Sequence, residues 1–285
     1  MALDKKQLAV YSEFIFKELG IFYSEANYYQ LEPRLKEAAK MLGYEDAIDM
    51  LSKTDLATNA KLRNIILDLS TNNETLFFRD REIFDGIAKN VLDPYMQNLS
   101  PVLPFKIWSA ACSTGQEVYS LIFTLEKYKK SNPTFSYNVL ASDYSTRVLD
   151  YAKEAKYRRL ETQRGLLASE LNSYFEKGSD DNGEYWSVLP KYKKKADFKQ
   201  INLRKKWPLS TTYNAILCRN VLIYQLKEEK EKILKRLHEK LSPGGVLILG
   251  CAESIIGMSE YFEQKMDGVS VYYIKKELTK KLGAA

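Results

Sequence analysis

Apolar residues in the first quarter of the chain recur with the spacing of amphipathic helices, and charged residues fill the positions between them. Gly20 and Gly43 stand where two of these helices would end, because glycine readily adopts the left-handed backbone of a helix C-cap. The apolar positions that carry the pattern are Leu8, Tyr11, Ile15, Leu31, Leu35, Ala38, Leu62, Ile65, Ile66 and Leu69. We therefore predict an all-helical N-terminal domain over residues 1–69.

The pattern changes after residue 105 to short apolar runs, each followed by a segment with helical spacing. The runs occupy residues 105–110, 137–143, 213–218 and 245–250. Strands that alternate with helices in this way predict an α/β fold with a parallel sheet. We predict that this second domain spans residues 70–285.

A turn-rich stretch over residues 174–200 interrupts the α/β pattern. Its centre, Asp180-Asp-Asn-Gly183, has the composition of a tight turn, and short polar–apolar alternation flanks it. We predict that this stretch is a small antiparallel β-subdomain inserted into the second domain.

The scarcity of histidine and cysteine limits the chemistry of the chain. Its 285 residues include one histidine, His238, and three cysteines that lie far apart, Cys112, Cys218 and Cys251. Two-histidine zinc sites, histidine-based catalytic triads and disulfide frameworks need more of these residues or closer spacing. The sequence also shows no signal peptide and no apolar run of about 18 residues. We expect a cytoplasmic protein with no metal and no membrane insertion.

The net charge of +6 is unevenly distributed. Basic side chains concentrate in residues 191–206, where Asp197 is the only acidic residue. Such a run is commonly a solvated face, and it also suits the docking of an acidic protein. Tyr185, Trp186 and Tyr192 interleave with it as in single-stranded nucleic-acid sites, but no RNA-binding module is recognisable, so we expect no nucleic-acid partner.

Candidate ligand residues follow the first two apolar runs of the α/β domain, because ligands of such sheets bind beyond the carboxyl ends of the strands. Small residues in the segment 109–117 would let a ligand approach the backbone, although Gly-x-Gly-x-x-Gly is absent. Asp143 ends the second run, where its carboxylate would accept hydrogen bonds from ribose hydroxyls or cap the helix that opens at Ser145. These features favour a nucleoside cofactor, either a nicotinamide cofactor or S-adenosylmethionine.

A polar segment before the sheet, residues 71–80, is a second candidate site. Arg79 supplies a fixed positive charge with directional donors. Phe77 and Phe78 beside it would either pack into a core or cover a ring of the size of adenine. A capped helix between the domains is the structural alternative.

Four ordered segments carry a family resemblance. They are residues 71–80 (TNNETLFFRD), 108–120 (WSAACSTGQEVYS), 218–224 (CRNVLIY) and 241–250 (LSPGGVLILG), followed by Glu253-Ser254. Together they resemble the CheR family, the bacterial chemotaxis receptor glutamate O-methyltransferases. The resemblance implies a Rossmann-like class I methyltransferase fold. It also implies transfer of a methyl group from S-adenosylmethionine to glutamate side chains on the cytoplasmic helical bundle of chemoreceptors, with S-adenosylhomocysteine as the product.

The resemblance also implies roles for individual residues. Asn73, Thr75 and Arg79 would border the methionine end of the cofactor, and Arg79 with Tyr224 would lie nearest the transferring methyl as the catalytic residues. The remaining cofactor-binding residues would be Ala111, Glu117, Asp143, Asn202, Leu203, Arg219 and Asn220. The β-subdomain resembles one that docks a C-terminal receptor tail in some members.

The chain departs from the family at its expected substrate contacts. The family commonly has an arginine just after the aromatic pair represented by Tyr174-Phe175, where this chain has Glu176-Lys177. Lys177, Lys193 and Lys194 are the candidate substrate-binding residues, and the protein is expected to act as a monomer. The N-terminal domain is slightly acidic, whereas in several members it is basic where it meets the receptor.

A carboxylate acceptor suits a chain poor in histidine. Glutamate titrates around pH 4.3, so it is ionised near pH 7 and needs no general base. Catalysis then depends on alignment and charge. Two alternatives remain: a docking module that keeps the cofactor as a structural ligand, and a carboxyl methyltransferase that acts on an acidic protein other than a chemoreceptor.

Overall fold

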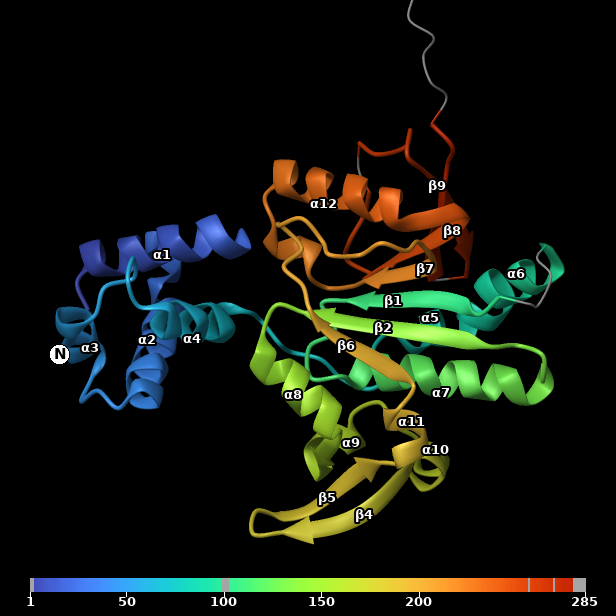
Figure 1. Cartoon of the computed structure of the whole chain (residues 1–285), viewed down its shortest axis with the longest axis horizontal. Coiled ribbons are helices and arrows are strands. Elements are labelled where there is room, and N and C mark those ends of the chain that lie inside the picture. Colours follow the sequence, from blue (N-terminus) through green and yellow to red (C-terminus); the bar gives the residue numbers. More distant parts are fainter. Residues whose placement is uncertain (1–2, 99–102, 256, 269, 279–285) are drawn as a thin grey trace, which may run out of the picture.

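The computed structural model describes residues 3–98, 103–255, 257–268 and 270–278. Its first part is a group of helices with its own apolar core, which includes Leu8, Ile15, Leu35 and Ile66 (Figure 1). The helices are α1 (Lys5–Leu19), η1 (Glu25–Asn27), α2 (Tyr28–Leu42), α3 (Ala47–Lys53) and α4 (Ala60–Ser70).

Two glycines end the long N-terminal helices, as the sequence predicts. Gly20 and Gly43 follow α1 and α2 with φ angles of 76° and 80°, which lie in the left-handed region. The N–H of Gly20 donates to the carbonyl of Phe16, which closes the last turn of α1. The predicted C-caps are thus confirmed.

A seven-stranded sheet forms the centre of the second part, in the order β6-β2-β1-β7-β8-β10-β9. The pairs from β6 to β8 are parallel, and β10 runs antiparallel to β8 and β9. The strands are β1 (Phe105–Ala110), β2 (Tyr137–Asp143), β6 (Ala196–Gln200), β7 (Tyr213–Cys218), β8 (Leu241–Leu249), β9 (Phe262–Asp267) and β10 (Ser270–Lys275). The predicted strands are confirmed. From β1 the strand order runs to one side through β2 and β6 and to the other side through β7 and β8, and sheets of this kind bind ligands at such a switch point.

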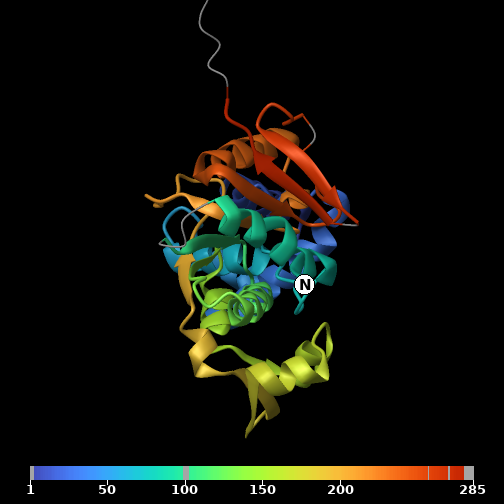
Figure 2. The same cartoon turned by 90° about the vertical axis from the view of Figure 1, so that its right-hand side faces the viewer.

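Helices cover both faces of this sheet (Figures 1 and 2). Successive side chains of each strand point to opposite faces. Ile107, Leu217 and Ile248 lie in one core with residues of α5 and α7. Trp108 and its neighbours on the other face lie in a second core with residues of α12. The bounds are α5 (Arg81–Ile87), α7 (Gln116–Ser131), α8 (Thr146–Glu154) and α12 (Lys227–Lys240). This is a Rossmann-like arrangement of a sheet between two layers of helices, as the sequence predicts.

A separate three-stranded antiparallel sheet, in the order β3-β5-β4, lies at the bottom of Figure 1. It consists of β3 (Lys156–Arg158), β4 (Phe175–Asp180) and β5 (Gly183–Val188). The predicted subdomain, residues 174–200, therefore had wrong boundaries. Strand β3 of this sheet lies before that stretch, and the end of the stretch forms β6 of the main sheet. Strand β3 is only three residues long, which is too short for a clear alternation of apolar and polar positions.

The remaining short elements connect these layers. They are η2 (Ala88–Leu92), α6 (Asp93–Asn98), α9 (Arg159–Gln163), α10 (Ala168–Tyr174), α11 (Pro190–Lys193) and η3 (Leu222–Tyr224). Within the described ranges, none of the helices has the length and apolar character that a bilayer crossing needs.

Candidate active site

One pocket lies at the carboxyl ends of β1, β2 and β7, and the end of α1 forms part of its wall. It collects every residue that the sequence predicts for cofactor binding or catalysis, although these residues lie far apart along the chain. They are Asn73, Thr75, Arg79, Ala111, Glu117, Asp143, Asn202, Leu203, Arg219, Asn220 and Tyr224. Leu19, Ile21, Arg204 and Gln225, which sequence reasoning missed, also line it.

The loop after β1 is bent tightly around the pocket. Ala111, Ser113 and Gly115 all have positive φ angles, of 62°, 50° and 94°. A Cβ on Gly115 would lie 2.8 Å from the Cβ of Ala152, so only glycine fits here without displacing α8. The hydroxyl of Ser113 donates to the carbonyl of Asn73 over 2.8 Å, which ties this loop to the segment before the sheet.

Asp143 lies at the end of β2 with only 6% of its surface exposed. Its two carboxylate oxygens accept the backbone N–H groups of Ser113 (2.9 Å) and Ser145 (3.0 Å). Burial raises the pKa of Asp143, and the backbone donors oppose that rise. Ser145, not Asp143, is the N-cap of α8, since its hydroxyl accepts from Val148. Asp143 also lines the pocket, and a carboxylate can accept further hydrogen bonds from a ligand.

A buried arginine connects the loops after β1 and β7. The side chain of Arg219 is 1% exposed and pairs with Glu117 (3.0 Å) and Asp80 (2.7 Å). It also donates to the backbone carbonyl of Arg79 over 2.6 Å. Glu117 accepts a further bond, from the hydroxyl of Ser109 (2.7 Å). Pairing of this quality offsets the cost of burying the charges, and it fixes the backbone at Arg79.

Glu253 holds the loop that carries the candidate catalytic tyrosine. One of its oxygens accepts the N–H groups of Val221, Leu222 and Ile223, at 3.0, 2.7 and 3.2 Å. The other accepts those of Asn220 (2.6 Å) and Gly250 (2.9 Å). Sequence reasoning found Glu253 only as part of a motif and gave it no role.

Arg79 and Tyr224 lie at the pocket and are partly open to solvent. The guanidinium of Arg79 donates weakly to the carbonyl of Glu74, over 3.3 Å, and has no ion pair within the described ranges. Tyr224 is 41% exposed, and its hydroxyl oxygen accepts a bond from the side-chain amide of Asn72 over 2.6 Å. A cation and a hydroxyl are thus available on the same pocket for an incoming acid.

The polar groups of the pocket fit S-adenosylmethionine. In the part of the chain that the structure describes, two buried side-chain polar atoms have no hydrogen-bond partner, Nε of Arg219 and Oε1 of Gln225. Both residues line this pocket. Buried polar atoms are rarely left unpaired, so one donor and one acceptor here indicate a polar ligand. The cofactor offers a carboxylate, amino groups and ribose hydroxyls as partners.

Other predicted positions lie outside the pocket. Phe77 and Phe78 are buried in the core, which decides between the two roles left open for them. Lys177 pairs with Glu184 in the small sheet. Lys193 donates to the carbonyl of Glu154 and the hydroxyl of Ser187, at 2.7 and 2.8 Å, whereas Lys194 is exposed. Over the described residues, no group of three or more metal-ligating side chains is placed to hold an ion.

Comparisons with known proteins relate the chain to a family of methyltransferases. The family model described as CheR methyltransferase, SAM binding domain, matches residues 73–270. The chain is 30% identical over 277 residues to chemotaxis protein methyltransferase Cher2 of Pseudomonas putida, covering 96% of this chain and 98% of the relative. It is 32% identical over 275 residues to a chemotaxis protein methyltransferase of Vibrio parahaemolyticus, with the same coverage. A solved magnesium protoporphyrin IX methyltransferase from Synechocystis is similar at a TM-score of 0.39 and 14% identity, over 86% of this chain and 95% of that chain.

The family match extends over most of the chain and includes every predicted cofactor residue. The chain belongs to the CheR family of S-adenosylmethionine-dependent methyltransferases.

Proposed function

We propose that the protein methylates glutamate side chains on the cytoplasmic helical domains of chemoreceptors during chemotactic adaptation. The products would be glutamyl 5-O-methyl esters and S-adenosylhomocysteine. The observation that carries the proposal is Arg79, a cation on the cofactor pocket without a carboxylate partner in the described ranges. The chemotaxis names of the relatives support a receptor as the acceptor.

The pocket suits an acceptor that arrives already deprotonated. A glutamate carboxylate is ionised near neutral pH, so the reaction needs no general base. His238, the one histidine of the chain, instead donates a hydrogen bond from Nε2 to the carbonyl of Lys276 over 2.9 Å. Glu117 and Asp143 are committed to Arg219 and to backbone N–H groups. These contacts agree with a reaction in which neither carboxylate acts as a general base.

Arg79 and Tyr224 would orient the acceptor. Arg79 would hold one carboxylate oxygen by a charge-assisted hydrogen bond. Because the Tyr224 oxygen already accepts from Asn72, its own proton remains free to donate to the same carboxylate. Both contacts fix the direction of attack.

The bound cofactor would supply a methyl group on a positively charged sulfur. The carboxylate of the acceptor would take this methyl group, and the sulfur would be left neutral in S-adenosylhomocysteine. The residues of this chain contribute position: Asp143 would accept the ribose hydroxyls, and the Arg219–Glu117 pair would fix the loops beside the methionine end.

The receptor would contact surfaces outside the pocket. Lys194 is exposed and free to meet an acidic helix, and Lys177 lies on the small sheet that would dock a receptor tail. We propose that the protein acts there as a monomer.

The decisive experiment is incubation of the protein with methyl-labelled S-adenosylmethionine and purified chemoreceptor cytoplasmic domains. We expect label on the receptor that mild base releases as methanol, as from an ester. Receptor domains with their exposed glutamates changed to alanine are the control and should stay unlabelled. Base-stable label, or label on the alanine control, would contradict glutamate methylation. Label on another acidic protein alone would contradict the receptor as acceptor.

A further inference from the structure

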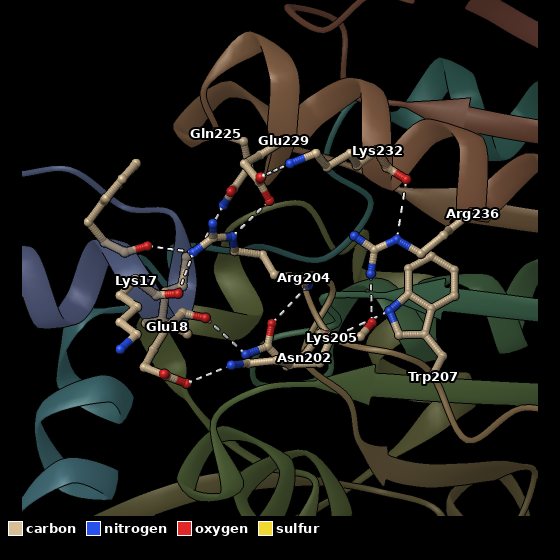
Figure 3. A network of polar contacts seen from close by, with 12 residues as sticks. Lys17, Glu18, Asn202, Arg204, Lys205, Trp207, Gln225, Glu229, Lys232 and Arg236 are labelled. Carbon is tan, nitrogen blue, oxygen red and sulfur yellow. Dashed lines mark hydrogen bonds and ion pairs between the residues drawn. The ribbon is translucent and has the colours of Figure 1, made fainter. Parts of the chain in front are cut away.

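Three side chains of the methyltransferase part donate to the backbone carbonyls at the C-terminal end of α1, and Lys205 also pairs with the Glu18 side chain over 3.2 Å (Figure 3). Arg204 donates to the carbonyls of Phe16 and Lys17, the latter over 2.7 Å. Asn202 donates to the carbonyl of Glu18, and Gln225 donates to that of Leu19, both over 3.0 Å. Each of the last four carbonyls of the helix therefore accepts a bond from across the interface. We call this set of contacts the α1 joint.

Helix ends leave such carbonyls without partners inside the helix, and they carry partial negative charge. Arg204 brings a full positive charge to this end of α1 and also pairs with Glu229 over 3.0 Å. Both side chains of that pair are only 16% exposed. Partial burial reduces screening by salt, so this contact is stronger than an ordinary surface ion pair.

The α1 joint is also part of the cofactor pocket. Asn202, Arg204 and Gln225 line the pocket, together with Leu19 and Ile21 from the end of α1. The side-chain oxygen of Asn202 accepts the N–H of Arg204 over 2.8 Å while its amide holds Glu18. The side chain of this predicted cofactor residue therefore fastens α1 through its NH₂ group and orients Arg204 through its oxygen.

Gly20 completes the α1 joint from the helix side. Its φ of 76° suits glycine, and a Cβ here would lie 2.1 Å from Oε1 of Gln225. A larger residue would therefore displace the side chain that holds Leu19, in addition to straining the C-cap.

We propose that the α1 joint is a positioning element of the cofactor site, and that Arg204 is its central positioning residue. Docking of α1 completes the pocket wall. Cofactor binding and α1 docking are therefore thermodynamically coupled, and each strengthens the other by the same factor. The inference concerns cofactor binding alone, so it holds for any methyl acceptor.

The first test measures the affinity of S-adenosylhomocysteine by calorimetry. We expect Arg204→Met and Gly20→Ala, which act from the two sides of the joint, each to raise Kd by about 10-fold. The double variant should raise Kd by much less than 100-fold, because both changes break the same contact. Arg236→Met is the matched control: Arg236 donates to the carbonyls of Lys232 and Lys205 and does not contact α1, so its Kd should stay within about twofold.

The second test measures backbone hydrogen exchange over residues 16–21 with and without S-adenosylhomocysteine. Coupling predicts that the ligand slows exchange there in the wild type and in Arg236→Met, and has a smaller effect in Arg204→Met. An unchanged Kd in Arg204→Met, or additive effects in the double variant, would overturn the proposal. If Arg204→Met does not fold, Arg204→Lys replaces it: a single ammonium cannot span both carbonyls and Glu229, so an intermediate rise in Kd is expected.

Discussion

The cofactor pocket has two walls built on different principles. The strand-end wall contains Asp143, Glu117, Arg219 and the loop that Glu253 holds from behind. Its buried charges are partnered by backbone N–H groups and by oppositely charged side chains of the same part. The α1 wall consists of neutral carbonyls at a helix end, bound by side chains of the other part of the chain. The first wall is fixed by the sheet, whereas the second exists only while α1 is docked. We therefore expect the strand-end wall to set the chemistry and the α1 wall to adjust affinity.

The largest effect should come from Arg79, whose guanidinium lines the pocket and forms no ion pair with either wall in the described ranges. Arg79→Ala should lower methyl transfer by about 100-fold or more at saturating cofactor, because the acceptor loses its charged partner. Arg79→Lys should recover part of the rate, since it keeps the charge but loses the planar fork. Single-turnover assays with labelled cofactor measure both. Transfer by the alanine variant within threefold of the wild type would exclude Arg79 from catalysis.

Glu253 tests whether the strand-end wall is fixed by its buried charge. In Glu253→Gln one oxygen becomes an NH₂ group that faces backbone donors, so the free energy of unfolding should fall by about 2–3 kcal/mol. Urea denaturation measures this loss. Glu263→Gln is the matched control, because Glu263 is an exposed partner of Lys265. Equal stability of the two variants would show that the five backbone bonds are not what fixes the loop.

The two walls also differ in what the sequence reveals about them. Asp143 was predictable because strand periodicity locates the end of β2, and sheets of this type bind ligands there. Arg204 and Gln225 were not, because their partners on α1 lie 187 and 206 residues away and no local pattern marks such a contact. The same limit applies to β3, which pairs with a strand beyond two intervening helices. Lys193 resembles its neighbours in sequence, yet tertiary packing directs it onto the carbonyl of Glu154.

The pH dependence of cofactor affinity separates the walls. Burial raises the pKa of Asp143 above 3.8, against the backbone donors, and the ionised form is the better acceptor for ribose hydroxyls. Affinity for S-adenosylhomocysteine should therefore fall by up to about tenfold per pH unit as the pH drops below the pKa of Asp143. Because the pKa of Asp143 is higher in the folded than in the unfolded protein, protonation of Asp143 favours the folded state. This contribution to the free energy of unfolding is largest in acid and is lost as the pH rises through the folded-state pKa. Unfolding driven by Asp143 therefore cannot explain a loss of affinity in acid.

Two variants identify the group that causes this fall of affinity at low pH, which we call the acid limb. Arg204→Met should bind more weakly at every pH and keep the limb, because its wall contains no titrating carboxylate facing the ligand. Asp143→Asn should bind weakly and lose the limb. Calorimetric titrations between neutral and mildly acid pH, with folding checked by circular dichroism, measure both. An acid limb that persists in Asp143→Asn would assign it to another group.

The smallest effect concerns the basic run, which lies outside both walls. Lys194 is exposed, so Lys194→Ala should raise the KM for the receptor by about twofold at low ionic strength, and the difference should vanish in ~0.5 M salt as exposed charges are screened. Its neighbour Lys193 is the matched comparison. Burial lowers the pKa of Lys193, and its two bonds tie α11 to β5 and the end of α8. Lys193→Ala should therefore lower the thermal midpoint while its effect on KM persists in salt. If the KM effect of Lys194→Ala also persisted in ~0.5 M salt, both lysines would act through the fold, and the receptor would then have to be recognised elsewhere.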